Sequence, residues 1–182
     1  MKLVILDRDG VINEDRDDYV KSVAEWQPLP DSLEAIANLT QAGWRVVVAT
    51  NQSGLGQGLF DMQALNAMHE KMHRLVNQAG GRIDAVVFCP HTKHERCKCR
   101  KPEPGMVLQI AERFNARLEG LPMIGDSLRD LQAIAAVGGQ PILVRTGKGL
   151  RTLEAGDLPD DTLVFDNLYE AAEYLIHSSD FQ

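Results

Sequence analysis

The chain has 182 residues, of which 44% are apolar and 25% are charged, and its formal net charge is −7. These values fit one globular domain over residues 1–182 with a single sizeable core. The acidic balance argues against a broad nucleic-acid-binding surface. No apolar run approaches the roughly 20 residues that span a bilayer, so we expect no nucleic-acid partner and no membrane partner.

The first predicted element is a strand at residues 3–6 (LVIL), followed by Asp7, Arg8, Asp9 and Gly10. An unbroken apolar run predicts a strand that is buried on both faces of a parallel sheet. Ligands bind beyond the carboxyl ends of such strands, where the two acids lie. Neighbouring carboxylates repel each other unless a cation or a shared proton intervenes, so the pair suits Mg²⁺. A solvated turn is the alternative at this point.

An acidic segment at residues 13–30 has no helical period, and we expect it to form a loop over the mouth of the site. A helix is predicted between Asp31, or the serine after it, and Gly43, because these are capping and stop signals. A second buried strand follows at 45–49 and ends in the polar residues 50–53.

Gly54, Gly56 and Gly58 come next, with G-x-G-x-G spacing instead of the G-x-G-x-x-G of dinucleotide sites. We therefore expect a mobile loop that lets the backbone approach a substrate. The helix that follows carries His69 and His73, four residues apart. They could share a metal ion, but no third ligand is near in the sequence, and we favour a solvated helix face.

Strands and helices alternate through the rest of the chain, with a Gly- and Asp-rich loop before the last strand. Strands are predicted at 85–88, 121–126, 141–146 and 163–165, and helices at 61–79, 107–118, 128–135 and 168–176. This alternation predicts an α/β fold with a doubly wound, mostly parallel sheet of the Rossmann-like type.

Polar residues end four of the predicted strands, and the carboxyl ends of parallel strands share one edge of a sheet. The residues expected to meet there are Asp7, Asp9, Thr50, Asn51, Arg100, Lys101 and Asp126. Three acids, a hydroxyl and a lysine at one rim are what phosphoryl transfer requires, because cations spread the charge of the phosphate and a carboxylate attacks in line.

A second group of candidate ligands consists of Cys89, His91, Cys97 and Cys99. It contains all three cysteines of the chain and one of its histidines. Three thiolates and an imidazole are a usual tetrahedral zinc set, although this spacing is tighter than in most zinc fingers. His94 is the competing imidazole. We predict a structural zinc ion, because a long irregular loop has little else to hold it. Its task would be to aim the two basic residues that follow.

These motifs resemble, over nearly the whole chain, those of the haloacid dehalogenase-type phosphatases. The resemblance implies that Asp7 is a nucleophile that forms an aspartyl-phosphate, and that Asp9 protonates the leaving oxygen and then activates water. It implies that Thr50 and Lys101 steady the phosphoryl group. It also implies a Mg²⁺ ion held by Asp7, Asp126 and the backbone carbonyl of Asp9.

Two positions depart from the pattern of that group. Position 11 is Val where many members carry Thr, and position 127 is Ser where an acid or a lysine is common. Neither removes a charge that the chemistry needs. The outer contacts to Mg²⁺ near Ser127 are the part that these departures leave open.

The zinc loop with Cys-Arg-Lys-Pro at 99–102, together with Thr-Asn-Gln-Ser-Gly at 50–54, resembles two related families within the group. They are the D-glycero-D-manno-heptose 1,7-bisphosphate 7-phosphatases of lipopolysaccharide core biosynthesis and the histidinol-phosphate phosphatases. We favour the first, because Arg100 adds a second cation that suits a substrate with two phosphates. The chain also ends after the phosphatase domain. A catalytically idle zinc-bearing scaffold and a phosphotransferase are the other hypotheses.

The short segments between the motifs leave no room for a cap domain, so we expect an open cleft that binds a small sugar bisphosphate. The expected substrate contacts are Asp15, Arg16, Asp17, Asp18, Thr50, Asn51, Gln52, Ser53, Arg100 and Lys101. A core strand that begins at residue 3 leaves no room for a signal peptide. Clustered cysteines suggest metal instead of disulfides. We expect a cytoplasmic monomer.

Overall fold

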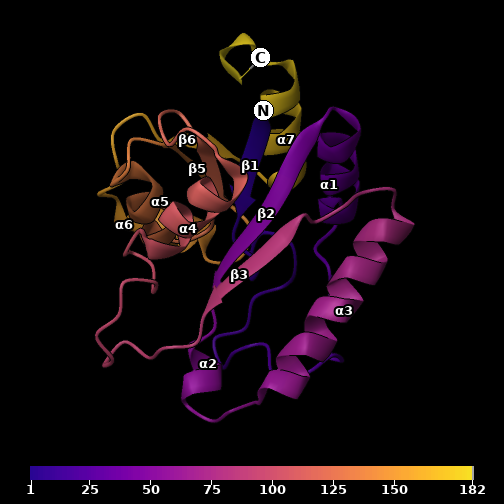
Figure 1. Cartoon of the computed structure of the whole chain (residues 1–182), viewed down its shortest axis with the longest axis vertical. Coiled ribbons are helices and arrows are strands. Elements are labelled where there is room, and N and C mark those ends of the chain that lie inside the picture. Colours follow the sequence, from indigo (N-terminus) through magenta and orange to yellow (C-terminus); the bar gives the residue numbers. More distant parts are fainter. Residues whose placement is uncertain (182) are drawn as a thin grey trace.

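The computed structural model describes residues 1–181 and is built on a six-stranded sheet in the order β3-β2-β1-β4-β5-β6 (Figure 1). Every neighbouring pair in this sheet is parallel. The strands are β1 (Lys2–Leu6), β2 (Trp44–Asn51), β3 (Ala85–Cys89), β4 (Pro122–Gly125), β5 (Gln140–Val144) and β6 (Leu163–Phe165). The predicted doubly wound parallel sheet is therefore confirmed.

Helices cover both faces of the sheet. They are α1 (Ser32–Gln41), α2 (Ser53–Gly56), α3 (Met62–Gln78), α4 (Gly105–Phe114), α5 (Leu128–Ala135), α6 (Gly149–Ala155) and α7 (Leu168–His177), followed by a 3₁₀ turn, Ser179–Phe181. Helices α1, α3 and α7 pack on one face, and α4 and α5 pack on the other (Figure 1). None of the helices within residues 1–181 has the length and apolar character needed to cross a bilayer.

The central strand β1 shows how the sequence builds both layers. Val4 and Leu6 face the core beneath α1, α3 and α7, whereas Leu3 and Ile5 face the core beneath α4 and α5. Side chains alternate between the two faces of a strand, so an unbroken apolar run is what a strand covered on both sides requires. Because β1 lies between β2 and β4, its carboxyl end opens where the strand order reverses, which is where ligands bind in such sheets.

Three local predictions were wrong. The Gly- and Asp-rich segment before β6 contains α6, whose only buried residue is Gly149, so no apolar stripe announced it. The residues after β2 form the short helix α2 where a loop was expected. Helix α4 ends at Phe114, with Asn115 in the left-handed conformation, so Leu118 lies outside it.

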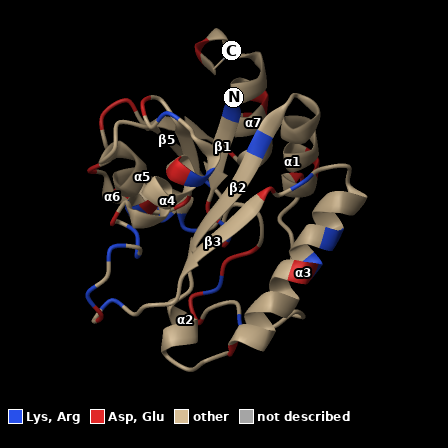
Figure 2. Cartoon of the chain, in the orientation of Figure 1, with Lys and Arg blue, Asp and Glu red and all other residues tan. Residues whose placement is uncertain are grey.

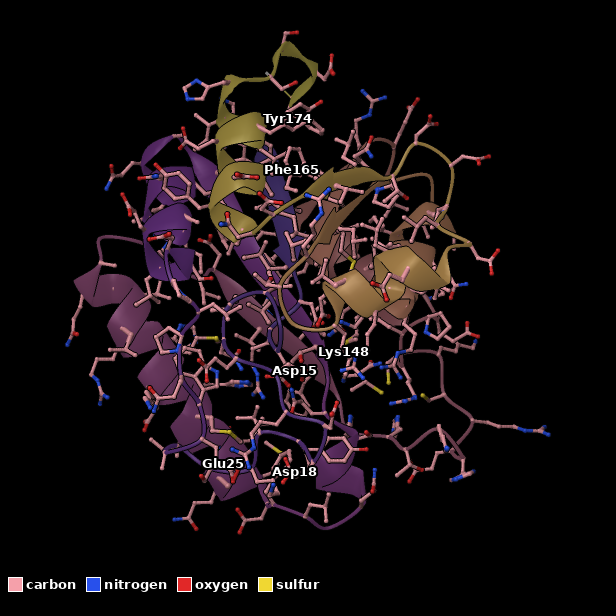
Figure 3. The ribbon with its side chains drawn as sticks, turned by 180° about the vertical axis from the view of Figure 1, so that it is seen from behind. Asp15, Asp18, Glu25, Lys148, Phe165 and Tyr174 are labelled. Carbon is pink, nitrogen blue, oxygen red and sulfur yellow. The ribbon has the colours of Figure 1, made fainter. Side chains whose placement is uncertain are left out.

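The chain ends lie together at the amino edge of the sheet (Figure 1). The aromatic ring of Phe181 lies 6.1 Å from that of Trp44, which begins β2 beside Lys2. Phe165 and Tyr174, labelled in Figure 3, join β6 to α7 with ring centroids 5.2 Å apart. The polar residues that end the strands therefore lie at the opposite edge, away from both termini.

Candidate active site

A cleft opens at the carboxyl edge of the sheet. Eleven predicted site residues line it: Asp7, Asp9, Asp15, Arg16, Asp17, Thr50, Asn51, Ser53, Arg100, Lys101 and Asp126. The cleft encloses about 760 Å³, part of which is open solvent, and this space is of the size that accepts a small ligand. Strands β1, β2 and β4 thus bring together residues that are more than a hundred positions apart in the sequence.

Two expected substrate contacts lie elsewhere. Gln52 is buried, and its side-chain amide donates to Thr50 Oγ1 at 2.9 Å and to Asp9 Oδ2 at 3.3 Å. The carboxylate of Asp18 pairs with Arg16 and Lys21. Neither residue lines the cleft, so Gln52 supports Thr50 and Asp9 from behind.

Lys101 is the buried cation of the site, with 2% of its side chain exposed. Its Nζ atom donates to Asp7 Oδ1 at 3.0 Å and to the carbonyl oxygen of Ala49 at 2.7 Å. The same atom lies 2.7 Å from Asp130 Oδ1. Burial alone would lower the pKa of Lys101, but the two carboxylates raise it above its ordinary value. The lysine is therefore charged at any pH at which the protein works.

The main chain around Lys101 is held by Asn51 at the end of β2. The Asn51 amide donates to the Lys101 carbonyl at 3.1 Å, and the Asn51 carbonyl oxygen accepts from the Lys101 N–H at 3.0 Å. This reciprocal pair ties the loop before α4 to the sheet. Asn51 was predicted as a substrate contact, and its side-chain amide already has both functions occupied by the protein backbone.

Asp7 and Asp126 form an acidic cluster with Asp130, in which carboxylate oxygens lie within 4.8 Å of one another. Burial and then repulsion from Asp130 raise the pKa of Asp7 to about 7, although Lys101 opposes the shift. Burial and repulsion from Asp7 and Asp130 also raise the pKa of Asp126 well above its ordinary value. Three buried carboxylates beside one lysine fit a divalent cation, which would relieve this repulsion.

Hydrogen bonds from Lys148 and Thr152 hold Asp126 tightly at the end of β4. Its Oδ2 atom accepts from the N–H of Lys148 at 2.9 Å, and its carbonyl oxygen accepts from the Thr152 hydroxyl at 2.8 Å. Gly10 and Gly147 both have positive φ and both pack against Oδ2, so a Cβ atom at either position would collide with the carboxylate. Gly10, which follows Asp7 and Asp9, is thus required because the Asp126 carboxylate approaches its backbone closely.

Asp9 is clamped by its neighbour Arg8, whose side chain is completely buried. Arg8 Nε donates to Asp9 Oδ1 at 2.8 Å and Arg8 Nη2 donates to Oδ2 at 3.1 Å, a bidentate pair. Asn13 donates to Asp9 Oδ1 at 2.8 Å. Burial would favour the neutral acid, but the Arg8 guanidinium lowers the pKa of Asp9 below its ordinary value. We gave Arg8 no role from the sequence.

We predicted a solvated helix face for His69 of α3, but its ring is partly buried and lies against the Arg8 side chain. Its Nε2 atom is 3.2 Å from Arg8 Nη1. Burial and the charge of Arg8 lower the pKa of His69 to about 4. Within residues 1–181, His69 and His73 belong to neither of the clusters that could hold a metal ion.

Asp130 is the buried site residue that sequence reasoning missed. It lies in the first turn of α5, where its Oδ2 atom accepts from the Ser127 N–H at 3.1 Å and from the Ser127 hydroxyl at 3.0 Å. This is a capping box, and the Ser-x-x-Asp pattern directly after Asp126 was the available signal. The serine at position 127 thus bonds to Asp130 and helps to position it.

The outer wall of the cleft is made of six charged side chains and one tyrosine that are partly or well exposed, and we call them the rim. The rim consists of Asp15, Arg16, Asp17, Tyr19, Arg100, Arg129 and Lys148, and the floor consists of Asp7, Asp9, Thr50, Lys101, Asp126 and Asp130. In the rim, Lys148 Nζ lies 3.1 Å from Asp15 Oδ2 (Figure 3). Tyr19, Arg129 and Lys148 were not predicted.

The rim combines an acidic segment with a basic one. Figure 2 shows the acidic residues of the segment after β1 and the basic residues of the loop between β3 and α4 near the same edge of the sheet. Arg16 pairs with Asp18 and Glu25, and Asp17 pairs with Arg151. Within residues 1–181, Arg100 and Arg129 are paired with no carboxylate, so both are available to a bound anion.

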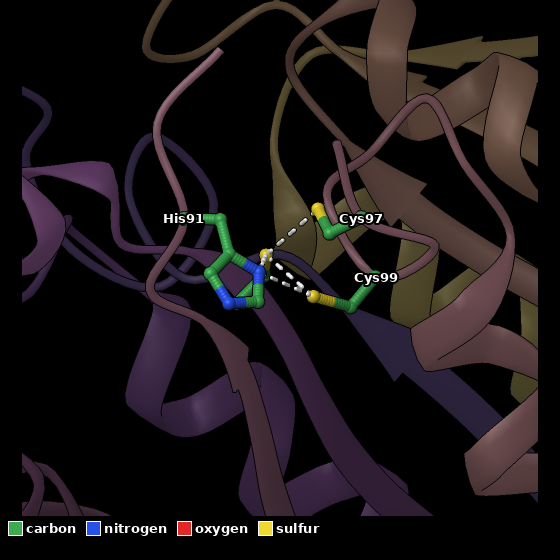
Figure 4. Close-up of side chains that lie close together, drawn as sticks. His91, Cys97 and Cys99 are labelled. Carbon is green, nitrogen blue, oxygen red and sulfur yellow. Dashed lines mark hydrogen bonds between the residues drawn. The ribbon is translucent and has the colours of Figure 1, made fainter. Parts of the chain in front are cut away.

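The cysteine loop gathers its four predicted ligands at one point. The sulfur atoms of Cys89 and Cys97 are 3.9 Å apart, and His91 Nδ1 lies 3.5 Å from Cys89 Sγ and 3.3 Å from Cys99 Sγ (Figure 4). Zinc–sulfur bonds of about 2.3 Å place tetrahedral ligands about 3.8 Å apart, so most of these distances fit. The Cys89 and Cys99 sulfurs, at 2.7 Å, would separate to hold an ion.

The thiols of this loop differ in acidity, because Cys89 is buried and Cys97 accepts hydrogen bonds. Burial and a hydrogen bond with Cys99 raise the pKa of Cys89 to about 12. Burial acts the same way on Cys97, but hydrogen bonds from the Arg100 N–H and from His91 outweigh it and lower its pKa to about 7. His94, the competing imidazole, is exposed and outside the cluster. The donor set therefore fits a soft divalent metal such as zinc.

Two family models match the chain. A HAD-hydrolase-like model matches residues 98–171, and a polynucleotide kinase 3 phosphatase model matches residues 2–127. The chain is 58% identical over 181 residues to the D-glycero-beta-D-manno-heptose-1,7-bisphosphate 7-phosphatase of Neisseria meningitidis, covering 98% of this chain and 97% of that protein. The Pseudomonas aeruginosa protein of the same name is 53% identical over 174 residues, covering 96% of this chain and 97% of the relative.

Solved structures agree with these relatives. The D,D-heptose 1,7-bisphosphate phosphatase of Bordetella bronchiseptica, complexed with magnesium and phosphate, has a TM-score of 0.95 at 57% identity and covers 97% of this chain and 98% of its own. The D,D-heptose 1,7-bisphosphate phosphatase of Burkholderia thailandensis has a TM-score of 0.79 at 53% identity and covers 98% and 100%.

Proposed function

The chain belongs to the haloacid dehalogenase-like hydrolases, in the family of the D-glycero-beta-D-manno-heptose-1,7-bisphosphate 7-phosphatases, and we propose that it removes the 7-phosphate of this sugar bisphosphate. One observation carries the proposal. Asp7, Asp9, Lys101 and Asp126 converge in a single cleft of a chain that matches these phosphatases over nearly its whole length. We propose that residues 1–182 act as a single phosphatase domain.

Asp7 is the proposed nucleophile. One carboxylate oxygen attacks the phosphorus atom, the bond from phosphorus to the sugar oxygen breaks, and an aspartyl-phosphate results. Lys101, 3.0 Å from Asp7 Oδ1, orients this carboxylate and neutralises charge on the transferring group. Thr50 lies beside them, and because its hydroxyl oxygen accepts from Gln52, its proton is directed toward the cleft.

Asp9 is the proposed acid and base. It gives a proton to the sugar oxygen as that oxygen leaves, and it later takes a proton from the water that cleaves the aspartyl-phosphate. The two transfers cancel, so the free enzyme is restored. Arg8 favours the ionised form needed for the second step. The negative phosphate favours the protonated form needed for the first step, because like charges raise the pKa of a carboxyl group.

Asp7, Asp126 and the backbone carbonyl of Asp9 are the proposed ligands of Mg²⁺. Asp130 is a third acid of the cluster, but its carboxylate is committed to Lys101 and Ser127. A bound Mg²⁺ ion supplies positive charge to the phosphate and lets a carboxylate approach it. Magnesium is present in the related Bordetella structure.

The cysteine loop is proposed to hold zinc through Cys89, His91, Cys97 and Cys99. Its support is the four convergent donors, directly followed by Arg100 and Lys101. We expect one zinc per chain by elemental analysis, and a loss of metal with a rise in KM in the Cys97→Ser variant. His94→Ala is the control and should keep its zinc. A protein that is purified under reducing conditions without zinc and still shows normal KM would contradict this role.

The rim is proposed to select the substrate. Asp15, Arg16, Asp17 and Ser53 line the open side of the cleft, and Arg100 is the unpaired cation next to Lys101. A sugar with hydroxyl groups and a second phosphate supplies partners for both the acids and the arginine. The proposed setting is the cytoplasmic branch of lipopolysaccharide core heptose synthesis, with the protein acting as a monomer.

A phosphate-release screen with Mg²⁺ tests the substrate directly. The substrates are heptose 1,7-bisphosphate, fructose 1,6-bisphosphate and histidinol phosphate. We expect the highest kcat/KM for the heptose. A higher value for histidinol phosphate would support the second family that the sequence resembles, and no release from any phosphate ester would leave the idle scaffold. Transfer to an added alcohol instead of water would indicate a phosphotransferase.

A further inference from the structure

His69 is a partly buried titratable group to which the proposed reaction assigns no task. It comes from α3, which is otherwise a core helix whose buried residues are apolar. Its ring does not touch the cleft, since it is not among the lining residues. It instead meets the far side of Arg8, at 3.2 Å from Nη1. His69 of α3 thus contacts Arg8, the residue that lies between Asp7 and Asp9 directly after β1.

We infer that His69 is a positioning residue, which fixes the Arg8 guanidinium and through it holds the Asp9 carboxylate in the orientation needed for proton transfer. This inference rests on the proposed acid–base role of Asp9. Three side chains are in contact one after another, His69 with Arg8 and Arg8 with Asp9. The distance from His69 to Arg8 is 3.2 Å, and the two hydrogen bonds from Arg8 to Asp9 measure 2.8 and 3.1 Å.

Arg8 needs such a partner because it is completely buried. A guanidinium has five N–H donors and no acceptor, and it cannot lose its proton in a protein. Asp9 satisfies two of these donors from one side. The Nη1 donor faces His69 instead, and a buried donor without a partner costs about 1–3 kcal/mol. The imidazole therefore fixes the orientation of the guanidinium plane. Because Arg8 binds Asp9 through two parallel hydrogen bonds, the orientation of the Asp9 carboxylate is fixed as well.

The contact also defines the state of the ring. Because Arg8 can only donate, Nε2 of His69 must be the unprotonated acceptor, and the ring proton must lie on Nδ1. A neutral ring is required, since two cations would repel each other at this distance. The burial of the ring and the charge of Arg8 both favour that neutral form.

Proton transfer to the leaving oxygen gives a readout that a purely structural role would not move. An alkoxide leaving from a sugar needs a proton, whereas p-nitrophenolate leaves without one. The value of kcat/KM depends on the steps up to release of the leaving group. A variant that impairs proton donation therefore raises the ratio of kcat/KM for p-nitrophenyl phosphate to kcat/KM for the sugar phosphate. We use wild-type protein, Asp9→Asn as the reference, His69→Leu and His69→Gln.

We expect His69→Leu to lower kcat/KM for the sugar phosphate by about tenfold or more, as loss of an oriented acid–base group does, and to leave p-nitrophenyl phosphate within about twofold. His69→Gln offers a carbonyl oxygen to Arg8 and should stay within about threefold on both substrates. His73→Leu is the matched control on the next turn of α3, and it should behave as wild type. Equal losses on both substrates in His69→Leu, or no loss on either, would overturn the inference.

The wild-type protein supplies a second test that does not depend on the folding of a variant. Nitrogen-15 NMR of the histidine rings should place the His69 proton on Nδ1 near neutral pH, and a proton on Nε2 would overturn the inference. Failure of the proposed function is distinguishable. If Asp9→Asn itself showed no difference between the two substrates, the acid–base role of Asp9 would fail, whatever His69 does.

Discussion

The floor and the rim of the cleft are built in opposite ways. The floor comes from the ends of buried strands, and its charges are enclosed and paired, with Lys101 2% exposed between Asp7 and Asp130. The rim comes from irregular segments and helix ends, and its side chains are open to solvent, as in Asp17 at 81% and Arg16 at 45%. Buried charge is costly to change, whereas exposed pairs contribute little to stability.

We propose that this difference separates the chemistry, which belongs to the floor, from substrate recognition, which belongs to the rim. The floor resists change because each charged group balances another in a low-dielectric site. The rim can vary, since its ion pairs are worth about 0–1 kcal/mol each. Changes in the floor should therefore act on kcat and on stability, and changes in the rim should act on KM and on the choice of substrate. The four predictions that follow test this division, from the largest expected effect to the smallest.

Asp7→Asn should remove turnover by at least ~10⁴-fold, equivalent to about 5 kcal/mol of transition-state stabilisation. The amide retains the shape of the side chain but cannot form an acyl phosphate. Phosphate release measures the loss, and circular dichroism checks the fold. Asp166→Asn, at an exposed carboxylate paired with Arg145, is the control and should keep full activity. Turnover above one hundredth of wild type in Asp7→Asn would break the comparison at its strongest point.

Asp130→Asn should lower the free energy of unfolding by about 2–3 kcal/mol, because Lys101 loses one of its two carboxylate partners inside the protein. We expect kcat to fall as well, since Lys101 is freed to move. Denaturant unfolding and steady-state kinetics measure the two effects. If neither quantity changed, the buried network would not be part of the floor.

Arg100→Ala should raise KM for a sugar bisphosphate by about tenfold, near 1.4 kcal/mol, with kcat little changed. The reason is that Arg100, on the rim beside Lys101, forms no ion pair with any carboxylate of residues 1–181. For a monophosphate of the same sugar the change in KM should be much smaller. Equal increases for both substrates would sink the assignment of Arg100 to the second phosphate.

The smallest predicted effect is a dependence of Mg²⁺ stabilisation on pH. In the cation-free protein the pKa of Asp7 is raised to about 7, above its value near 4 in an unfolded chain. The folded state then holds more protons between these values, so this contribution to stability falls as pH rises from 4 to 7. Mg²⁺ binds the ionised carboxylate and offsets the loss.

The rise in Tm on adding Mg²⁺ should therefore be larger at pH 8 than at pH 5. Asp7→Asn removes one of the two carboxyl groups with a raised pKa and should make the difference smaller. A thermal melt at each pH, with and without Mg²⁺, decides the matter. An equal rise in Tm at both pH values in the wild type would contradict a raised pKa for Asp7.

The floor was largely predictable from the sequence and the rim only in part, since Tyr19, Arg129 and Lys148 were not expected there. Apolar runs that end in Asp7 and Asp126 predict buried parallel strands, and the topology of such strands brings their ends together. Asp130 was missed because the Ser-x-x-Asp pattern predicts a helix cap, but it does not say that the capping carboxylate also reaches Lys101. The location of His69 was wrongly predicted because the helical period shows which side chains face the core, but it does not show that a polar residue such as Arg8 lies there.

The rim depended on irregular chain, where side-chain direction follows from tertiary contacts instead of a period. Asp18 and Gln52 were both expected in the cleft, yet one turns toward Arg16 and Lys21 and the other lies behind Thr50. The helix α6, which carries no apolar stripe, is placed by the hydrogen bond from Thr152 to the Asp126 carbonyl. The cysteine loop was the exception, because metal-ligand spacing is visible in the sequence.

The central claim is that Asp7 attacks phosphorus and carries the phosphoryl group. Rapid acid quench during turnover of the sugar bisphosphate with Mg²⁺, followed by borohydride reduction, converts an acyl phosphate at an aspartate into homoserine. Peptide mass spectrometry then locates the reduced residue. We expect homoserine at position 7 alone, and only in samples that were quenched during turnover. Reduction at another carboxylate, or at none while phosphate is being released, would contradict the account.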